Sequence, residues 1–348
     1  MAYTDIDDPS AYFQTLLWSG NGSNRSLTFD GNSDLQPDWS WIKQRSGTNY
    51  HTLTDSVRGL NKQIYSNATD AEATQTTNIT AYGSNGVSLG TDSNVNGNSS
   101  TYVGWFWKAG TSFTNDASST GIGSIDSAGS FNNDNGFSIV SYTGTGSAGT
   151  IKHGLSTTPS TIIYKRRNST SGWVVWHTSL GTGILELNET GASQGGSSYT
   201  NGTAPTSSVF SIGTSGDINA DGGTFIAYCF AEKQGYSKFG SYTGNGNADG
   251  TFVYTGFKPA WIMVKITSGT SNWRIFDNKR IGYNVDNNPL YPNVTNTEGT
   301  EDNIDILSNG FKWRTTDGAL NGSGSSYIYM AFAENPFVTS TGVPATAR

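Results

Sequence analysis

The stretch FGSYTGNGNADGTFVYTGFKPAWIMVK, residues 239–265, occurs in three divergent versions along the chain. The others are IVSYTGTGSAGTIKHGLSTTPSTIIYK, residues 139–165, and LLWSGNGSNRSLTFDGNSDLQPDWSWIK, residues 16–43. Each version has an aromatic residue followed by Ser or Thr and a Gly-x-Gly element, and later a proline that precedes a lysine by six positions. Self-similarity at a long period indicates repeated structural units. We therefore expect three copies of one unit.

The copies also agree beyond this stretch. Each one ends in an aromatic run, and these runs read TYVGWFWKAG from Thr101, TFIAYCFAEK from Thr224 and SYIYMAFAEN from Ser326. Each run leads almost directly into the next copy, so we expect the copies to pack against one another rather than move freely. The predicted organisation is an N-terminal arm at 1–12, repeats at 13–112, 113–234 and 235–335, and a C-terminal tail at 336–348.

Composition favours strands over helices. The 348 residues include 44 glycines, aromatic residues make up 12% and charged residues only 14%. Turn signals such as Asn-Gly recur every ten or so residues, which is the spacing of a sandwich or jelly roll. The segment Pro259–Lys265 is apolar at nearly every position, so it predicts a strand buried on both faces. The sequence thus predicts an all-β fold of three tandem β-sandwich repeats, of jelly-roll or concanavalin-like type, packed together.

Charge and targeting signals limit the partners. The net charge of −7 disfavours nucleic acid and anionic membrane surfaces, and no apolar stretch is long enough for a transmembrane helix. The start lacks the features of a signal peptide, so we expect synthesis in the cytoplasm and give the Asn-x-Ser/Thr sequons at Asn67, Asn78 and Asn168 no weight. Cys229 lies in an apolar run and predicts a buried, inert thiol. The basic cluster 165–167 is interpreted as a solvated strand end.

Candidate catalytic groups are sparse. The three histidines, His51, His153 and His177, are not shared between the copies, which favours surface or hydrogen-bonded histidines over a triad or a metal site. Glycoside hydrolysis needs two carboxyl groups about 5–10 Å apart. The dense acidic candidates lack the alternating spacing that one strand face would give and are interpreted as solvated loop carboxylates: Glu186, Glu189, Glu301, Asp302 and Asp305.

Binding motifs have an alternative structural interpretation in each case. Asp217, Asn219 and Asp221 match the start of a calcium loop, but the twelfth position is Tyr228 instead of Glu. A polar turn is therefore preferred over bound Ca²⁺, and no other cofactor is expected. The Gly-x-Gly elements lead into strands and are interpreted as hairpin turns that need positive φ, not as phosphate loops. Trp39, Trp41, Trp261 and Trp273 are conceivable platforms for sugar rings. Core packing is preferred for Trp39, Trp41 and Trp261, which lie in the predicted buried strands.

The segments MAYTDIDDPSAYFQTLLWSGNGS, LQPDWSWIKQRSG, LTDSVRG, STYVGWFWKAG and MAFAENPFV resemble a family of virion proteins of marine tailed phages, including phages of cyanobacteria. Members are labelled virion structural, tail-fibre or lectin-like proteins, and the resemblance covers nearly the whole chain. It implies a location on the virion surface and other virion proteins as partners, with no catalytic residues to transfer.

We therefore expect a non-enzymatic virion structural protein. The first hypothesis is a tail-fibre or receptor-binding subunit, as a homotrimer, that recognises host surface polysaccharide. The second is a capsid decoration protein that stabilises the head. A polysaccharide-degrading enzyme is the third. The sequence does not separate tail from head, and it identifies neither the host nor the glycan.

Overall fold

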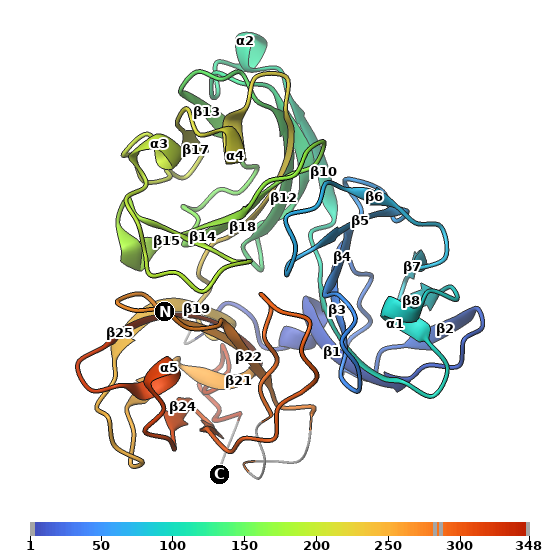
Figure 1. The fold of residues 1–348 in the computed structure, drawn as a ribbon, viewed down its shortest axis with the longest axis vertical. Coiled ribbons are helices and arrows are strands. Elements are labelled where there is room, and N and C mark those ends of the chain that lie inside the picture. The colour runs from blue at the N-terminus through green and yellow to red at the C-terminus, as the bar shows by residue number, and fades with distance from the viewer. Residues whose placement is uncertain (1–3, 281–283, 285–287, 346–348) are drawn as a thin grey trace.

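The computed structural model describes residues 4–280, 284 and 288–345, and it shows an all-β protein of antiparallel sheets with a few single-turn helices. The strands form three lobes arranged around a common centre (Figure 1). We define lobe 1 as Phe13–Trp107, lobe 2 as Thr111–Phe230 and lobe 3 as Ser237–Pro336. No helix within the described ranges is long and apolar enough to cross a membrane.

Lobe 1 contains a six-stranded sheet, β1-β9-β3-β4-β5-β6, that faces a three-stranded sheet, β2-β8-β7. A 3₁₀ turn, η1 (Pro9–Ala11), precedes the first strand, and helix α1 spans Ser93–Asn96. The strands are β1 (Phe13–Ser19), β2 (Arg25–Thr28), β3 (Trp39–Gln44), β4 (Thr52–Asp55), β5 (Lys62–Tyr65), β6 (Ala73–Thr74), β7 (Ile79–Gly83), β8 (Gly86–Leu89) and β9 (Thr101–Trp107).

Lobe 2 contains a seven-stranded sheet, β10-β11-β12-β18-β14-β15-β16, that faces the pair β13-β17. The strands are β10 (Thr111–Asn115), β11 (Ser127–Asn132), β12 (Phe137–Thr143), β13 (Gly149–Lys152), β14 (Thr161–Arg166), β15 (Trp173–His177), β16 (Ile184–Glu186), β17 (Val209–Ile212) and β18 (Thr224–Phe230). Its short helices are α2 (Ala117–Thr120), η2 (Thr178–Leu180), α3 (Ser197–Thr200) and α4 (Gly216–Asn219).

Lobe 3 contains a four-stranded sheet, β19-β25-β21-β22, that faces the sheet β20-β24-β23. The strands are β19 (Ser237–Thr243), β20 (Phe252–Tyr254), β21 (Phe257–Ile266), β22 (Arg274–Asp277), β23 (Ile304–Leu307), β24 (Gly310–Trp313) and β25 (Ser326–Pro336), with helix α5 at Gly318–Asn321. The expected boundary between 112 and 113 falls inside β10, and the one between 335 and 336 falls inside β25.

The strand order is the same at the centre of each large sheet. The closing aromatic strand lies between the opening strand and the strand that follows the proline: β1-β9-β3-β4, β12-β18-β14-β15 and β19-β25-β21-β22. Strand β21 is buried along almost its whole length, as its apolar sequence predicts. Because both neighbours of each closing strand come from the same lobe, the lobes meet through side chains and loops and not through a continuous sheet.

Each lobe has its own core between its two sheets, and a fourth core joins the three lobes. The joining core is rich in aromatic side chains, including Trp39 and Trp107 of lobe 1, Phe230 of lobe 2 and Trp261 and Phe332 of lobe 3. Burial of large apolar side chains is the main stabilising contribution to a fold of this kind. The expected packing of the three segments against one another is therefore present.

The Gly-x-Gly elements connect strands of two facing sheets, so the prediction of hairpin turns is wrong. Between β1 and β2, for example, the chain passes from the six-stranded sheet to the three-stranded one. A Cβ on Gly20 would lie 2.2 Å from the carbonyl oxygen of Gly97, and Gly22 has φ of +67°, so both positions need glycine. The sharp change of sheet explains why the chain needs two glycines there.

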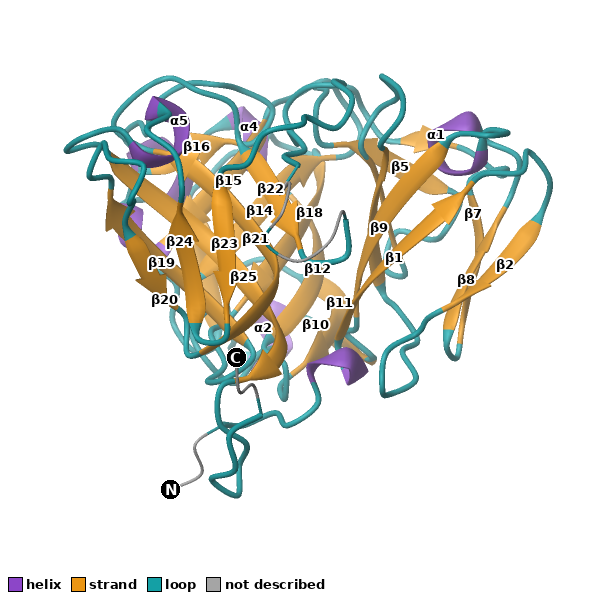
Figure 2. Ribbon diagram, turned by 90° about the horizontal axis from the view of Figure 1, so that it is seen from below, coloured by secondary structure: helices purple, strands orange, loops and turns teal. Residues whose placement is uncertain are grey.

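The two terminal segments lie together. The Asp5 amide donates to the Gln234 carbonyl at 3.2 Å, and the Ser340 amide donates to the Asp7 carboxylate at 2.6 Å. Figure 2 shows them on the side of the molecule opposite to α1, α4 and α5. Residues 1–3 of the expected arm and 346–348 of the expected tail lie outside the described residues.

Candidate functional site

Two buried ion pairs join the lobes near the common centre. Asp55 accepts hydrogen bonds from the Arg58 guanidinium and from the Tyr228 hydroxyl of lobe 2, the latter at 2.7 Å. In lobe 3, Asp277 accepts from Arg280 at 2.7 Å and from the Trp105 indole of lobe 1 at 3.0 Å. All these side chains are buried. Each carboxylate thus holds a charged partner in its own lobe and an aromatic donor from the neighbouring lobe.

The third contact of this type uses different chemistry. His177 is opposite Thr161 in the register, as Asp55 is opposite Trp39 and Asp277 is opposite Trp261. Its Nδ1 accepts from the Ser179 amide, so its Nε2 carries the proton and donates to the Tyr329 carbonyl of lobe 3 at 3.2 Å. Burial lowers the pKa of His177 to about 4. A neutral histidine therefore joins lobes 2 and 3.

The other two histidines are also buried and hydrogen-bonded. The Trp41 indole donates to His51 Nδ1 at 3.0 Å, and His153 bonds to the Thr206 carbonyl at 3.1 Å. Burial lowers both pKa values, to about 4 for His153. The hydrogen-bonded interpretation is therefore confirmed for all three, whereas a surface position is wrong, because neighbouring strands and loops cover each ring.

Two glutamates bridge adjacent lobes at the outer side of these contacts. Glu72 of lobe 1 binds Arg58 of its own lobe and, at 2.9 Å, Arg167 of lobe 2. Glu298 of lobe 3 binds Arg280 of its own lobe and, at 2.7 Å, Arg45 of lobe 1. The Arg45 and Arg280 guanidinium groups and the Asn288 amide hold the pKa of Glu298 at about 2 against the effect of burial. The Glu72 and Glu298 carboxylates therefore connect neighbouring lobes.

The interpretation of 165–167 as a solvated strand end is wrong. Lys165 is fully buried, and its ammonium donates to the Thr69 carbonyl of lobe 1 at 2.9 Å and to the Ser171 carbonyl at 2.6 Å. Lys43 and Lys265 occupy the same place after the prolines and are also buried, with main-chain carbonyls as acceptors. Burial lowers the pKa of each lysine to about 8. A carbonyl of the neighbouring lobe accepts from Lys165 and from Lys265, whereas both acceptors of Lys43 lie in lobe 1.

We predict that the free energy of unfolding rises between pH 8 and about pH 10. Lysine in the unfolded chain titrates near 10.5, whereas the three folded lysines lose their protons from about pH 8. In this range the unfolded chain binds more protons, so stability increases with pH. Above pH 10 the trend reverses, because burial raises the pKa of tyrosines such as Tyr142 and Tyr228. Urea unfolding at a series of pH values measures this, and Lys165→Met reduces the slope. A stability that falls from pH 8 to 10 contradicts the prediction.

The acidic residues considered for hydrolysis are spread over two lobes. Glu186 lies in β16, where burial raises its pKa, and Glu189 is exposed beyond it. In lobe 3, Glu301 lies 3.6 Å from Arg274, and Asp305 pairs with Arg314 at 2.6 Å. Asp302 is exposed. The loop interpretation holds for Glu189, Glu301 and Asp302, whereas Glu186 and Asp305 belong to strands.

The four candidate tryptophans are in the core. Trp39, Trp41, Trp261 and Trp273 are each no more than 2% exposed, so they are not sugar platforms. Among the described residues the exposed aromatic side chains are Tyr50, Phe252 and Tyr254, which sequence reasoning did not identify. Cys229 is buried, as expected, and burial raises its pKa.

The candidate calcium segment holds a turn through a buried asparagine. Asn219, in the last position of α4, accepts from the Thr145 amide at 2.8 Å and donates to the carbonyls of Ser147 and Gly213. Asp217 accepts from the Ser171 hydroxyl, and Asp221 is exposed. Among the described residues no cluster of three His, Cys, Asp or Glu side chains suits a metal ion. Asn96 and Asn321 make equivalent bonds in lobes 1 and 3.

We predict that Asn219→Ala destabilises the protein by about 1–3 kcal/mol, because it removes the partners of three backbone groups. Asp221→Ala is the control, and as a surface change it should stay within about 0.5 kcal/mol. Thermal unfolding with and without Ca²⁺ distinguishes the two interpretations. A calcium-dependent rise in Tm that Asp221→Ala abolishes would support the metal site.

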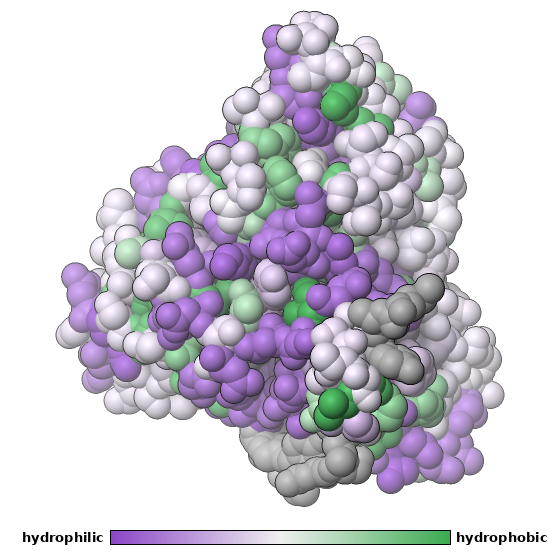
Figure 3. All heavy atoms as spheres, turned by 180° about the vertical axis from the view of Figure 1, so that it is seen from behind, coloured by the Kyte–Doolittle hydropathy of each residue, from purple (hydrophilic) through white to green (hydrophobic). Residues whose placement is uncertain are grey.

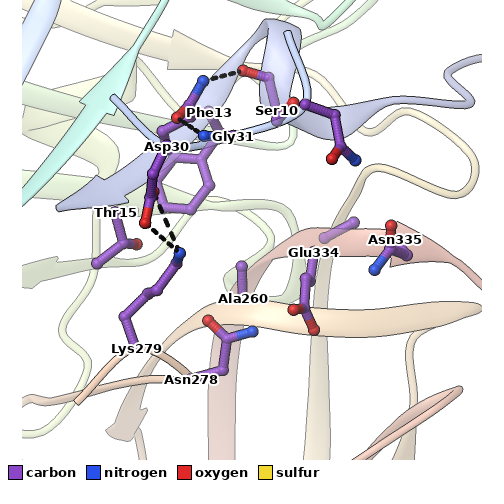
Figure 4. A pocket seen from close by; sticks show the side chains of 13 residues that line it. Ser10, Phe13, Thr15, Asp30, Gly31, Ala260, Asn278, Lys279, Glu334 and Asn335 are labelled. Atoms are coloured by element: carbon purple, nitrogen blue, oxygen red, sulfur yellow. Dashed lines mark hydrogen bonds and ion pairs between the residues drawn. The ribbon is translucent and has the colours of Figure 1, made fainter. Parts of the chain in front are cut away.

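A cleft of about 290 Å³ separates lobes 1 and 3. Figure 4 shows Thr15, Asp30 and Phe13 on the side of lobe 1, across from Asn278 and Glu334 of lobe 3. Lys279 crosses the boundary and pairs with Asp30 at 3.1 Å. Ala260 and Ala333 complete the apolar part of the lining. The cleft therefore combines hydrogen-bonding walls with a small apolar surface.

The wall from lobe 1 is held in place by Gln14. Its side-chain amide accepts from the Gly31 amide at 2.9 Å and donates to the carbonyls of Ser10 and Ser33, each at 2.9 Å. The Thr15 hydroxyl is buried, and no described residue provides a hydrogen-bond partner for it. A buried polar group without a partner carries an energetic cost and calls for an explanation. A ligand in the cleft would supply the missing partner.

The comparisons with known proteins give a family but no relative of known function. A family model described as a domain of unknown function (DUF7483) matches residues 8–336. No curated protein and no solved structure matches the chain significantly.

Proposed function

From the premise that the chain belongs to the DUF7483 family, a family of unknown function, we propose that it is a bacteriophage virion structural protein that acts by binding. The observation that supports a binding role is that the buried polar groups make structural contacts. The buried groups His177, Lys165, Lys265 and the carboxylates of the two buried ion pairs make hydrogen bonds between the lobes, while the cleft between lobes 1 and 3 is open and polar. We therefore propose no catalytic step.

We also propose that the three lobes are divergent copies of one β-sandwich-like unit, of jelly-roll or concanavalin-like type. Besides the common strand order, three equivalent contacts support this. The backbone amides of His51, Trp173 and Trp273 donate to the side-chain oxygens of Asn67, Asn188 and Asn293, respectively, at 2.6–3.1 Å. Contacts repeated in this way are typical of internal duplication.

The role we favour is host recognition by a tail-fibre or receptor-binding subunit, as a homotrimer on the virion surface. Its partners are other virion proteins and the host surface polysaccharide. Figure 3 supports a polar ligand, because hydrophilic residues gather at the centre of the face it shows, where the lobes meet. The acidic balance of the chain disfavours a polyanionic ligand.

Capsid decoration is the alternative. The lobes are compact, and the longest helices among the described residues have four residues, so no coiled-coil shaft is present in that part of the chain. Such a body suits a protein that sits on the head. The paired terminal segments on one side of the molecule would then provide the attachment to the capsid (Figure 2).

Gold-labelled antibody on intact virions tests these roles. Label confined to the tail supports receptor binding, and label over the head supports decoration. Virions without label contradict the virion assignment, provided that the same antibody detects the purified protein. Binding of the purified protein to host cells, measured before and after removal of their surface polysaccharide, then tests glycan recognition.

A further inference from the structure

The cleft between lobes 1 and 3 exists because two positions carry small residues there. In the strand register, Thr15 faces Trp105 as Ile139 faces Tyr228 and Phe239 faces Met330. The corresponding residues Ile139 and Phe239 are buried in the core that joins the lobes. Only lobe 1 has a short polar side chain at this position.

The second small residue is Ala260, which corresponds to Asp38 of lobe 1. Both precede the aromatic residue of the strand after the proline, and both carbonyls accept a backbone amide, from Asn278 and Ser56 respectively. In lobe 1 the Asp38 carboxylate accepts from the Ser56 hydroxyl at 2.8 Å and from the Ala109 amide at 2.9 Å. In lobe 3 there is no such carboxylate, because Ala260 ends at Cβ. The space that oxygen atoms occupy in lobe 1 is thus part of the cleft in lobe 3.

The charges around the cleft are balanced. Lys279 pairs with Asp30, and Glu334 pairs with Lys258, so among the described residues the lining offers neither an uncompensated cation nor an uncompensated carboxylate. A charged ligand would have to break one of these pairs. The polar side chains of Thr15 and Asn278 and the apolar surface of Phe13, Ala260 and Ala333 suit a neutral ligand that has both hydroxyl groups and an apolar face.

We propose that this cleft binds one neutral pyranose unit of a host surface glycan, an inference that rests on the glycan-binding role proposed above. A pyranose ring has hydroxyl groups around its edge and C–H groups on its faces, so it meets both parts of the lining. One sugar hydroxyl bonds to Thr15 Oγ1, which lacks a partner among the described residues. Another takes the place that the Asp38 carboxylate occupies in lobe 1. The volume is at the lower end of the range for small-molecule sites, which fits one sugar ring and not a long chain.

The test uses substitutions taken from the chain itself. Thr15→Ile and Ala260→Asp introduce the residues of the corresponding positions, Ile139 and Asp38, so each fills the cleft with a side chain that another lobe accommodates. The control is Lys238→Met, which breaks the exposed ion pair between Lys238 and Glu232 and changes no residue that lines the cleft. The Tm of each variant shows that it is folded.

The probes are the methyl glycosides of glucose, galactose, mannose and N-acetylglucosamine, with methyl glucuronide as the anionic counterpart, and binding is measured by NMR titration. We expect at least one neutral glycoside to bind in the millimolar range. Thr15→Ile and Ala260→Asp should each weaken it at least tenfold, whereas Lys238→Met leaves it unchanged. Preferential binding of the glucuronide would overturn the neutral-sugar assignment.

Two further outcomes separate this inference from the proposed function. If the protein binds host polysaccharide and both cleft-filling variants bind it equally well, glycan recognition stands but the cleft is not its site. If no neutral glycoside binds while host cells are still bound, the ligand class is wrong. If neither glycosides nor host cells are bound, the receptor-binding function itself fails.

Discussion

Asp55→Ala is expected to lower the free energy of unfolding by about 3–5 kcal/mol, because it leaves a buried guanidinium without its closest partner. Asp55 accepts from the Arg58 side chain, the Arg58 backbone amide and the Tyr228 hydroxyl, and all of these groups are buried. Glu72 remains near Arg58 at 3.2 Å, but it is shared with Arg167. Urea unfolding followed by tryptophan fluorescence measures the loss.

The control for this prediction is His177→Ala, at the corresponding position of lobe 2. The histidine is neutral and makes two hydrogen bonds, so its removal leaves no buried charge without a partner. The loss in the free energy of unfolding should therefore be smaller than for Asp55→Ala. If the two variants lose the same free energy of unfolding, the charge of Asp55 does not contribute more than a neutral hydrogen-bonding group.

A combined variant tests whether the lobes are equivalent. In lobe 2 the positions of Asp55 and Arg58 are taken by His177 and Leu180, and in lobe 3 the position of Tyr228 is taken by Met330. Asp55→His alone should be strongly destabilising. Adding Arg58→Leu and Tyr228→Met copies the contact between lobes 2 and 3 and should recover part of the loss, as coupled positions do. Simple additivity of the three changes would contradict the equivalence.

The main strands within each lobe could be predicted from the sequence. The buried strand Pro259–Lys265, the closing aromatic strands and the core positions of Trp39 and Trp261 follow from local apolar patterns, and the structure confirms them. Such patterns predict which residues of a strand face the core. They do not predict which lobes contact each other, and the wrong predictions concern residues at those contacts.

Lys165 illustrates this limit. A lysine at the end of an apolar strand normally lies in solvent, but here the Thr69 carbonyl of lobe 1 covers it. A signal was present, because Lys43, Lys165 and Lys265 each follow a proline by six residues in the three similar segments. A lysine on the surface would not need to recur at the same position in three similar segments, so this agreement pointed to a buried role.

The cleft could not be predicted from any single segment. Thr15 and Ala260 are 245 residues apart in the chain and become neighbours only when lobes 1 and 3 meet. Comparison of the three similar segments could have identified Thr15, since Ile139 and Phe239 stand at the corresponding positions. It would not have identified Ala260, because the small residue Ser160 stands at the corresponding position of lobe 2. Where equivalent positions differ in size and polarity, the departure from the repeated pattern marks a site worth testing.

Trp39→Ala is expected to destabilise the protein by about 3–5 kcal/mol and to weaken two lobes at once. The Trp39 ring packs at 4.6 Å from Trp107 of its own lobe and at 4.5 Å from Tyr228 of lobe 2, with Phe137 and Phe230 of lobe 2 close by. It is 1% exposed. Loss of the ring removes apolar contact from the core that joins the lobes, and the cavity lies between lobes 1 and 2.

Trp313→Ala is the matched control, since Trp313 is equally buried but contacts Tyr242, Phe276 and Phe311 within lobe 3 alone. Hydrogen exchange read by mass spectrometry separates the two effects. Faster exchange should appear in lobes 1 and 2 for Trp39→Ala and in lobe 3 for Trp313→Ala. If Trp39→Ala accelerates exchange in lobe 1 only, the lobes are energetically independent and the joining core contributes little to their cooperation. If it accelerates exchange across lobes 1 and 2, the aromatic core couples their stabilities, as do the Tyr228–Asp55 hydrogen bond and the Glu72–Arg167 ion pair between them.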